Sequence, residues 1–278
     1  MKERSDRFAF GENWRQFLSV LDEQRIREGE RSLVAMIGTS HLEGLRFCDV
    51  GSGSGLFSLA ARRLGARVMS FDFDPASVAC AAELRRRYAP DDPDWRIERG
   101  SALDQSFLKT IGKFDIVYAW GVLHHTGAMW RAMSLVADLV APNGSLWIAV
   151  YNDQGWQSRA WWLVKRAYNA LPRHLRFLIV APALVRLWGP TMFRDVLRGR
   201  PFATWRNYRS SRGMSAWHDL IDWVGGFPFE VASRDDVIEF YSRRGFATDK
   251  VELRRGIGCN EFLFKRLRAT EGREGRFD

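Results

Sequence analysis

The sequence predicts an α/β protein built on a doubly wound, mostly parallel sheet of seven strands. Two observations predict this class. Between residues 45 and 151, short apolar runs alternate with helical patterns, as in a parallel sheet covered by helices. After residue 233 the alternation resumes with one helix and two further apolar runs, which we expect to complete the sheet.

Each element has its own local signal. Apolar runs predict strands at 46–50, 67–73, 95–99, 114–119, 145–151, 246–253 and 260–267. Helical spacing predicts helices at 56–64, 76–88, 129–140 and 235–244. Asp74-Pro75 marks the start of the second helix, because proline is favoured in the first helical turn. Pro142-Asn143-Gly144 predicts a turn, and Gly245 is expected to end the last helix.

The pattern divides the chain into four parts. Residues 1–44 are expected to form an N-terminal helical extension that acts as a lid, and residues 45–151 form the ligand-binding core. Residues 152–233 break the alternation, which predicts a helical insertion after the fifth strand that holds or covers the substrate. Residues 234–278 complete the core.

The formal net charge of +9 is carried by one half of the chain. Residues 1–150 contain 19 basic and 19 acidic side chains, whereas residues 151–278 contain 23 and 14. Nucleic acid, an anionic membrane surface or an acidic substrate would each explain this asymmetry. The three cysteines form no CxxC pair, and the first residues lack the apolar stretch of a signal peptide. We therefore expect a cytoplasmic protein without disulfides or a zinc site.

A glycine-rich loop follows the first predicted strand. Glycines let the backbone approach a ligand closely, and the next helix offers unpaired N–H groups at its N-terminus. A dinucleotide fingerprint would need Gly or Ala at the sixth position of GxGxxG, where this sequence has Leu56. The loop residues expected to bind the ligand are Asp49, Gly51, Ser52, Gly53 and Gly55.

This loop resembles the first motif of the class I, Rossmann-like methyltransferases that use S-adenosylmethionine. In that family the acidic residue, here Asp49, interacts with the methionine end of the cofactor. Asp72, followed by Phe73, matches the acidic residue that binds both ribose hydroxyls, since a carboxylate can accept two hydrogen bonds. Ser101 and Ala102 stand where many members have Asp-Ala beside the adenine.

The resemblance continues after the fourth strand. Trp120-Gly121-Val122-Leu123-His124-His125 is similar to the family motif there, and we expect Trp120 at the cofactor. The proline-containing motif of enzymes that methylate nucleobase amino groups is absent, and no cysteine follows a proline as in cytosine-C5 enzymes. The Val-Leu-His-His form is similar to quinol and phenol O-methyltransferases of the ubiquinone-pathway type. The resemblance implies S-adenosylmethionine as cofactor, no obligatory metal, and methylation of a small or lipid-like acceptor at oxygen.

Two sets of residues are candidates for catalysis. His125 has the pKa range of a general base, and the alternative is that it only shapes the pocket. In the insertion, His218 and Asp219 lie in an aromatic-rich segment that suits the wall of a substrate site, where they could form a His–carboxylate base pair. The alternative is a structural loop held by its aromatic side chains, in which Asp219 pairs with a nearby arginine. Asn13 and Trp14 precede an amphipathic helix, and we expect them to cover the cofactor or to staple that helix.

Residues 156–200 raise the question of a macromolecular partner. They hold nine basic side chains and one acid, Asp195, together with four tryptophans. The apolar run 177–185 has nine residues and contains Pro182, so it is predicted not to span a membrane. The segment instead predicts a lid, a contact between copies of the chain, or a helix on the inner membrane surface.

Two other functions stay open. The first is an RNA methyltransferase that uses the basic half of the chain, although no RNA-binding module is recognisable. The second is a non-catalytic protein that binds S-adenosylmethionine and regulates a partner. An altered first motif would favour the second alternative, and here the motif is intact.

Overall fold

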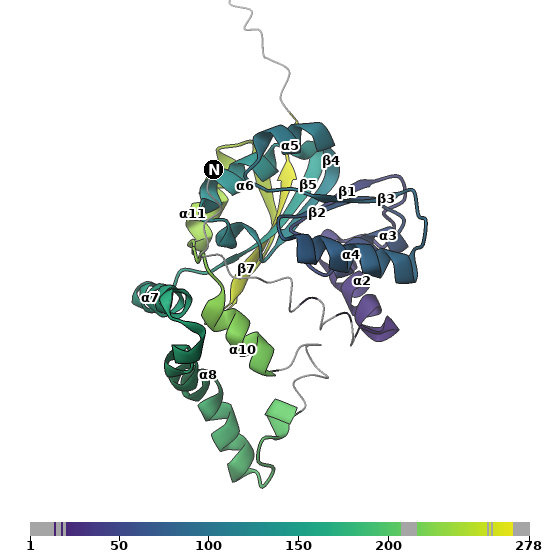
Figure 1. The fold of residues 1–278 in the computed structure, drawn as a ribbon. Coiled ribbons are helices and arrows are strands. Elements are labelled where there is room, and N and C mark those ends of the chain that lie inside the picture. Colours follow the sequence, from purple (N-terminus) through teal and green to yellow (C-terminus); the bar gives the residue numbers. More distant parts are fainter. Residues whose placement is uncertain are drawn as a thin grey trace, which may run out of the picture.

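The computed structural model describes Trp14, Leu18 and residues 21–206, 216–254, 256 and 258–268. Its centre is a seven-stranded sheet in the order β3-β2-β1-β4-β5-β7-β6 (Figure 1). β1 to β5 pair in parallel, and β7 runs antiparallel to both β5 and β6. The predicted fold class is confirmed. The strands are β1 (Arg46–Val50), β2 (Arg67–Asp72), β3 (Trp95–Arg99), β4 (Phe114–Trp120), β5 (Val140–Tyr151), β6 (Phe246–Glu252) and β7 (Cys259–Arg266).

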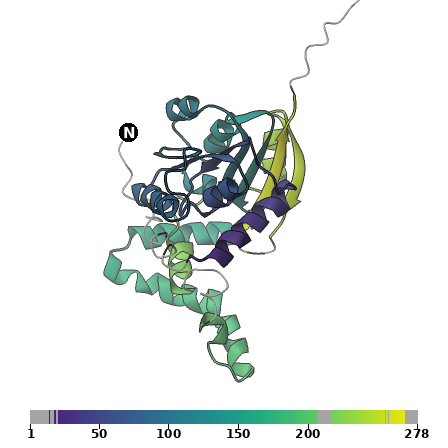
Figure 2. The same cartoon turned by 90° about the vertical axis from the view of Figure 1, so that its right-hand side faces the viewer.

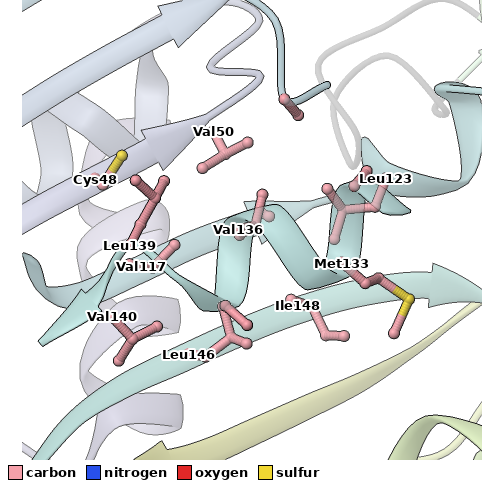
Figure 3. Packing of buried hydrophobic residues seen from close by; sticks show 14 of the residues in the cluster. Cys48, Val50, Val117, Leu123, Met133, Val136, Leu139, Val140, Leu146 and Ile148 are labelled. Carbon is pink, nitrogen blue, oxygen red and sulfur yellow. The ribbon is translucent and has the colours of Figure 1, made fainter. Parts of the chain in front are cut away.

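Helices cover both faces of the sheet. Buried apolar residues join α2, α3 and α4 to one face, and a second buried cluster joins α5, α6 and α11 to the other. Figure 3 shows the second cluster, where Met133 and Val136 of α6 lie against Val117 and Ile148 of β4 and β5. These helices are α2 (Glu23–Ile37), α3 (Leu56–Arg63), α4 (Pro75–Tyr88), α5 (Gln105–Ile111), α6 (Met129–Ala137) and α11 (Arg234–Ser242).

Short-range signals explain where most of these helices begin. The Asp74 carboxylate caps α4 by accepting the Ala76 N–H at 2.9 Å, and Pro75 follows it as predicted. The Asp104 carboxylate caps α5 by accepting N–H groups of Ser106 and Phe107. The sequence analysis missed α5 because its seven residues are too few to show a helical period.

The prediction of a turn between helix and strand at 142–144 is wrong, because these residues lie within β5. The helix before it ends at Ala137 instead of Val140, and β5 already begins at Val140, which pairs with Phe114. The pairing register shifts before Ser145 pairs with Ile116, so Pro142-Asn143-Gly144 forms an irregularity inside the strand. Asn143 adopts a positive φ of 63°, a conformation that asparagine tolerates well.

The insertion after β5 is helical. It comprises α7 (Trp156–Ala170), the short 3₁₀ turn η2 (Arg173–Leu175), α8 (Phe177–Leu197) and α10 (Ala216–Gly225). These elements share a small apolar cluster of their own, made by Tyr168, Val180, Ala183, Leu220 and Val224. Figures 1 and 2 show α8 reaching away from the sheet. The domain boundaries given above stay predictions.

The length of α8 corrects the sequence analysis. The nine-residue apolar run is part of a 21-residue helix that includes both Pro182 and Pro190. A proline removes only one N–H donor, so flanking turns can continue the helix where neighbouring groups compensate. Of the described helices, α8 together with η2 is long and apolar enough to cross a membrane, by length and composition only. The most apolar window of this segment is 11% buried within the molecule.

Candidate functional site

The glycine loop lies in a narrow space at the carboxyl edge of the sheet. Gly51 and Gly53 have positive φ values of 70° and 54°. A Cβ atom on Gly51 would lie 2.5 Å from the Val122 side chain, and one on Gly53 would lie 2.9 Å from the Trp14 indole. Only glycine therefore fits at both positions. The contact also places Trp14, from the N-terminal extension, directly against the loop.

Asp72 is held facing this loop at the end of β2. Its Oδ2 accepts the Gly53 N–H at 3.0 Å and its Oδ1 accepts the Asp74 N–H at 2.9 Å. Burial raises the pKa of the Asp72 carboxyl, an effect that these backbone hydrogen bonds oppose. Each carboxylate oxygen retains a further lone pair for a ligand donor. Phe73, the next residue, is 43% exposed.

Asp49 lies beneath the loop in a buried chain of polar groups. The Trp95 indole donates to Ser70 Oγ at 2.8 Å, Ser70 Oγ donates to Ser58 Oγ at 2.7 Å, and Ser58 Oγ donates to Asp49 Oδ2. Asp49 itself is 2% exposed. Burial raises the pKa of its carboxyl to about 7, while the Ser58 hydroxyl acts in the opposite direction.

The two histidines after β4 are in different environments. His124 is 1% exposed, and burial lowers the pKa of its imidazole well below the usual value. His125 is less enclosed, and its Nδ1 lies 2.7 Å from the backbone carbonyl oxygen of Pro228. A carbonyl only accepts, so Nδ1 carries a hydrogen. Because burial lowers the pKa of His125 to about 3, the ring is neutral and Nε2 carries its lone pair.

Aromatic side chains from the insertion and β5 surround the histidine pair. The Tyr151 ring lies 4.0 Å from the His124 ring and 5.4 Å from the His125 ring, measured between centroids. Trp223 and Phe229 lie 5.3 Å and 5.2 Å from the Tyr151 ring. The carboxyl edge of β4 and β5 thus has an aromatic wall beside a neutral imidazole.

Comparison with protein families identifies this architecture. Residues 21–196 match the family described as "Methyltransferase domain". The chain belongs to this methyltransferase family. The resemblance that the sequence motifs indicated is thereby confirmed.

Relatives of this methyltransferase share part of its length. A Ubiquinone biosynthesis O-methyltransferase of Rhodopseudomonas palustris is 32% identical over 158 residues, which are 56% of this chain and 58% of that protein. A Ubiquinone biosynthesis O-methyltransferase of Brucella ovis is 32% identical over 111 residues, which are 40% of this chain and 43% of that protein. The similarity therefore spans less than two thirds of these relatives.

Solved structures support the fold of the methyltransferase. Magnesium protoporphyrin IX methyltransferase from Synechocystis PCC 6803 with bound SAH superposes with a TM-score of 0.55 at 16% identity, covering 92% of this chain and 93% of that one. The same protein with bound SAM gives a TM-score of 0.52 at 16% identity, with 92% and 90% covered.

The glycine loop and its neighbours fit S-adenosylmethionine, the cofactor of this methyltransferase. Ser52 Oγ is buried and has no hydrogen-bond partner among the described residues, as expected for a group that faces a polar ligand. Asp72 presents a carboxylate with free lone pairs at the end of β2, where a ribose diol would be bound. Trp14 lies against Gly53, and its role in a lid stays a prediction.

The remaining predicted cofactor residues lie along the same edge. Ser101 Oγ accepts the Leu103 N–H at 3.1 Å, which uses its hydroxyl locally. The Ala102 side chain is 8% exposed and belongs to the core cluster. Trp120, at the end of β4, is 42% exposed. A cofactor contact for each of these residues stays a prediction.

Glu261 on β7 is a half-buried polar residue for which the sequence motifs predict no function. Its carboxylate accepts hydrogen bonds from the Trp147 indole at 3.2 Å and from Trp120, and burial raises its pKa. The register pairs Glu261 and Trp120 with the same β5 residue, Ala149. A carboxylate directly before the apolar run Phe262–Phe264 was the available signal.

Three predicted residues cannot be placed by their side chains. Asn13 lies outside the described residues. The backbone of α10 includes His218 and Asp219, but their side chains are outside the described part of the structure. Their roles stay predictions. Within the described residues, no group of three or more His, Cys, Asp or Glu side chains could hold a metal ion.

Proposed function

We propose that this methyltransferase methylates a hydroxyl oxygen of a small, lipid-like aromatic acceptor, with His125 as the general base. The observation that carries the proposal is the 2.7 Å contact between His125 Nδ1 and the Pro228 carbonyl. This contact fixes the tautomer that leaves Nε2 able to accept a proton. The names of the relatives, which are O-methyltransferases, support oxygen as the methylated atom.

The chemistry divides between the cofactor and the chain. S-adenosylmethionine, held by the glycine loop and Asp72, would supply the methyl group for the acceptor oxygen and would keep the electron pair of the broken carbon–sulfur bond on its sulfur. His125 Nε2 takes the hydroxyl proton, so the positive charge lost at sulfur reappears on the imidazole. Tyr151, Trp223 and Phe229 suit an aromatic acceptor ring, because edge-on and stacked aromatic contacts are favourable.

A turnover assay with labelled S-adenosylmethionine and a panel of catechols and hydroquinones tests the function. We expect His125→Ala to lower kcat by about 100-fold, the usual contribution of a general base. Cofactor affinity should stay within about twofold of wild type in that variant. Asp72→Ala should instead weaken cofactor binding by about 100-fold, through two lost charge-assisted hydrogen bonds. Full turnover by His125→Ala would exclude the proposed base.

We also propose that α8 contacts an anionic membrane surface. Its solvent-exposed side follows one helical stripe, in which Leu178, Val185, Phe193 and Val196 are 55%, 69%, 64% and 56% exposed. Its opposite side is also apolar and faces the cluster shared with α7 and α10. A helix that is apolar all round is normally covered on every side, so the exposed stripe calls for a partner.

The charges near the stripe favour a membrane over a second copy of the chain. Nine basic side chains lie in residues 156–200, and the single acid, Asp195, is buried and accepts hydrogen bonds from Thr204. Two copies that met through this surface would bring like charges together. Anionic lipid headgroups would complement the arginines while the stripe enters the acyl boundary. A lipid-like acceptor would be available at the same surface.

Co-sedimentation with vesicles of phosphatidylglycerol and phosphatidylcholine tests this contact. We expect the double variant Val185→Asn, Phe193→Asn to weaken vesicle binding by about 100-fold, since two apolar side chains lose their burial. Leu253→Asn is the matched control, because Leu253 is also an exposed apolar side chain, at 56%, but lies outside the insertion. Unchanged sedimentation of the double variant would exclude the membrane contact. A wild-type dimer that the variant dissociates would identify a second copy as the partner.

A further inference from the structure

We infer that Lys165 and Asn169 of α7 are positioning residues for His125. They fix the segment that carries the Pro228 carbonyl, and this carbonyl sets the tautomer of the imidazole. The inference rests on the proposed role of His125 as the base. It assigns a catalytic task to the insertion helix that the core motifs alone do not reveal.

Two side chains of α7 attach this helix to the end of α10. Lys165 is fully buried, and its ammonium donates a hydrogen bond to the Trp223 carbonyl. The Asn169 amide donates to the Gly225 carbonyl at 2.8 Å and, one turn back, to the Lys165 carbonyl at 2.9 Å. Two side chains one helical turn apart therefore hold the two carbonyls at the point where α10 ends.

From the end of α10, the chain leads directly to the histidine motif of the core. Five residues after Trp223, the Pro228 carbonyl accepts from His125 Nδ1. The Glu230 N–H then donates to the His124 carbonyl at 3.0 Å, and the Glu230 carboxylate accepts the Met129 N–H at 3.0–3.1 Å. Residues 223–230 thus form a short connection that is fixed by α7 at one end and by the histidine motif at the other.

The attachment uses a buried lysine, whose ammonium is surrounded by aromatic rings. Moving an ammonium out of water costs several kcal/mol. An apolar side chain at position 165 would pack against α10 without this desolvation penalty, so packing alone does not explain the lysine. Lys165 Nζ lies 4.5, 4.8 and 5.9 Å from the ring centroids of Trp223, Phe229 and Tyr151. These rings form the wall beside His125, and their π-faces stabilise the cation there.

The charge of the Lys165 ammonium also reaches both histidines. The ammonium lowers the pKa of both His124 and His125, in addition to the larger effect of burial. A neutral His125 keeps its Nε2 lone pair, which the proposed base needs in the resting site. The hydrogen bond to the Pro228 carbonyl instead raises the pKa of His125, so the hydrogen bond sets the tautomer and the nearby charge acts only on the protonation state.

Two α7 variants and one matched control test the inference in the full-length protein. Lys165→Met removes the charge and the hydrogen bond at similar length, and Asn169→Leu removes only the amide. Arg166→Met removes a charge from the exposed side of the same helix. Nitrogen-15 NMR of labelled histidine reports which ring nitrogen of His125 carries hydrogen, with no acceptor required. Catechol turnover and calorimetric cofactor affinity complete the set.

We expect both α7 variants to populate the second tautomer of His125 and to lower kcat about 10- to 100-fold. Cofactor affinity should stay within about twofold, and Arg166→Met should resemble wild type. The inference is overturned if Asn169→Leu, the milder change, folds and keeps both the wild-type tautomer and kcat. If the tautomer changes while His125→Ala remains fully active, the positioning role stands and the proposed base fails.

Discussion

Asp49 and Asp72 lie near the carboxyl ends of neighbouring strands, yet their carboxylates are held by different partners. Asp72 accepts two backbone N–H groups, which favour its charged form. Asp49 is enclosed below the loop, where Ser58 is its hydrogen-bonding side-chain partner. The coulombic effect of Asp72 further raises the pKa of Asp49. Burial raises the pKa of both carboxyls, and the more deeply buried Asp49 is the one that resists ionisation more strongly.

This difference predicts how stability without cofactor depends on pH. The Asp49 pKa of about 7 exceeds the unperturbed value of 3.8, so between these values the folded protein keeps a proton that the unfolded chain has lost. The free energy of unfolding should therefore fall as pH rises from 4 to 7, by at most about 4 kcal/mol from this group. Urea titrations of wild type and Asp49→Asn at several pH values measure it. Parallel curves for the two proteins would show that Asp49 does not titrate in this range.

Among the helices and strands, local sequence signals predicted the elements around the glycine loop well and those of the insertion, residues 152–233, poorly. The β1 strand, the glycine loop and the start of α3 at Leu56 follow from short-range chemistry, and all lie where predicted. The partner of His125 could not be predicted in this way, because Pro228 is 103 residues away in the chain. The continuation of α8 beyond Pro182 likewise depends on packing against α7 and α10, which no local pattern contains.

The N-terminus of α6 gives a prediction at this scale. Ala128 occupies the cap position and offers no capping side chain, and the Glu230 carboxylate from the insertion accepts the Met129 N–H instead. Glu230→Ala should lower the free energy of unfolding by about 1–2 kcal/mol, the value of a lost N-cap. Chemical denaturation measures this loss. Adding Ala128→Ser should restore part of it, because serine can cap the helix itself; no recovery would mean that Glu230 acts by fixing its own segment.

Across the whole molecule, charge and apolar exposure coincide in the insertion. The first 150 residues carry no net charge, and the +9 belongs to the remainder. α8 extends away from the sheet beside α7 and α10, with which it shares an apolar cluster (Figure 1). One continuous set of helices therefore joins the apolar surface to the proposed acceptor site. On that side, Trp223 of α10 contacts Tyr151, whose ring in turn contacts the rings of His124 and His125.

The salt dependence of binding separates a membrane from RNA as the partner of this surface. Membrane contact has an electrostatic part, which salt screens over a distance of about 10 Å at 0.1 M, and an apolar part, which salt does not weaken. Raising NaCl from 0.05 to 0.5 M should therefore lower vesicle binding and then leave a residual affinity, measurable by sedimentation. RNA binding would rest on phosphate contacts and would fall steadily on a logarithmic salt scale. The membrane proposal would be excluded if vesicle binding fell steadily to zero as NaCl rises and if, at low salt, the protein bound RNA more tightly than vesicles.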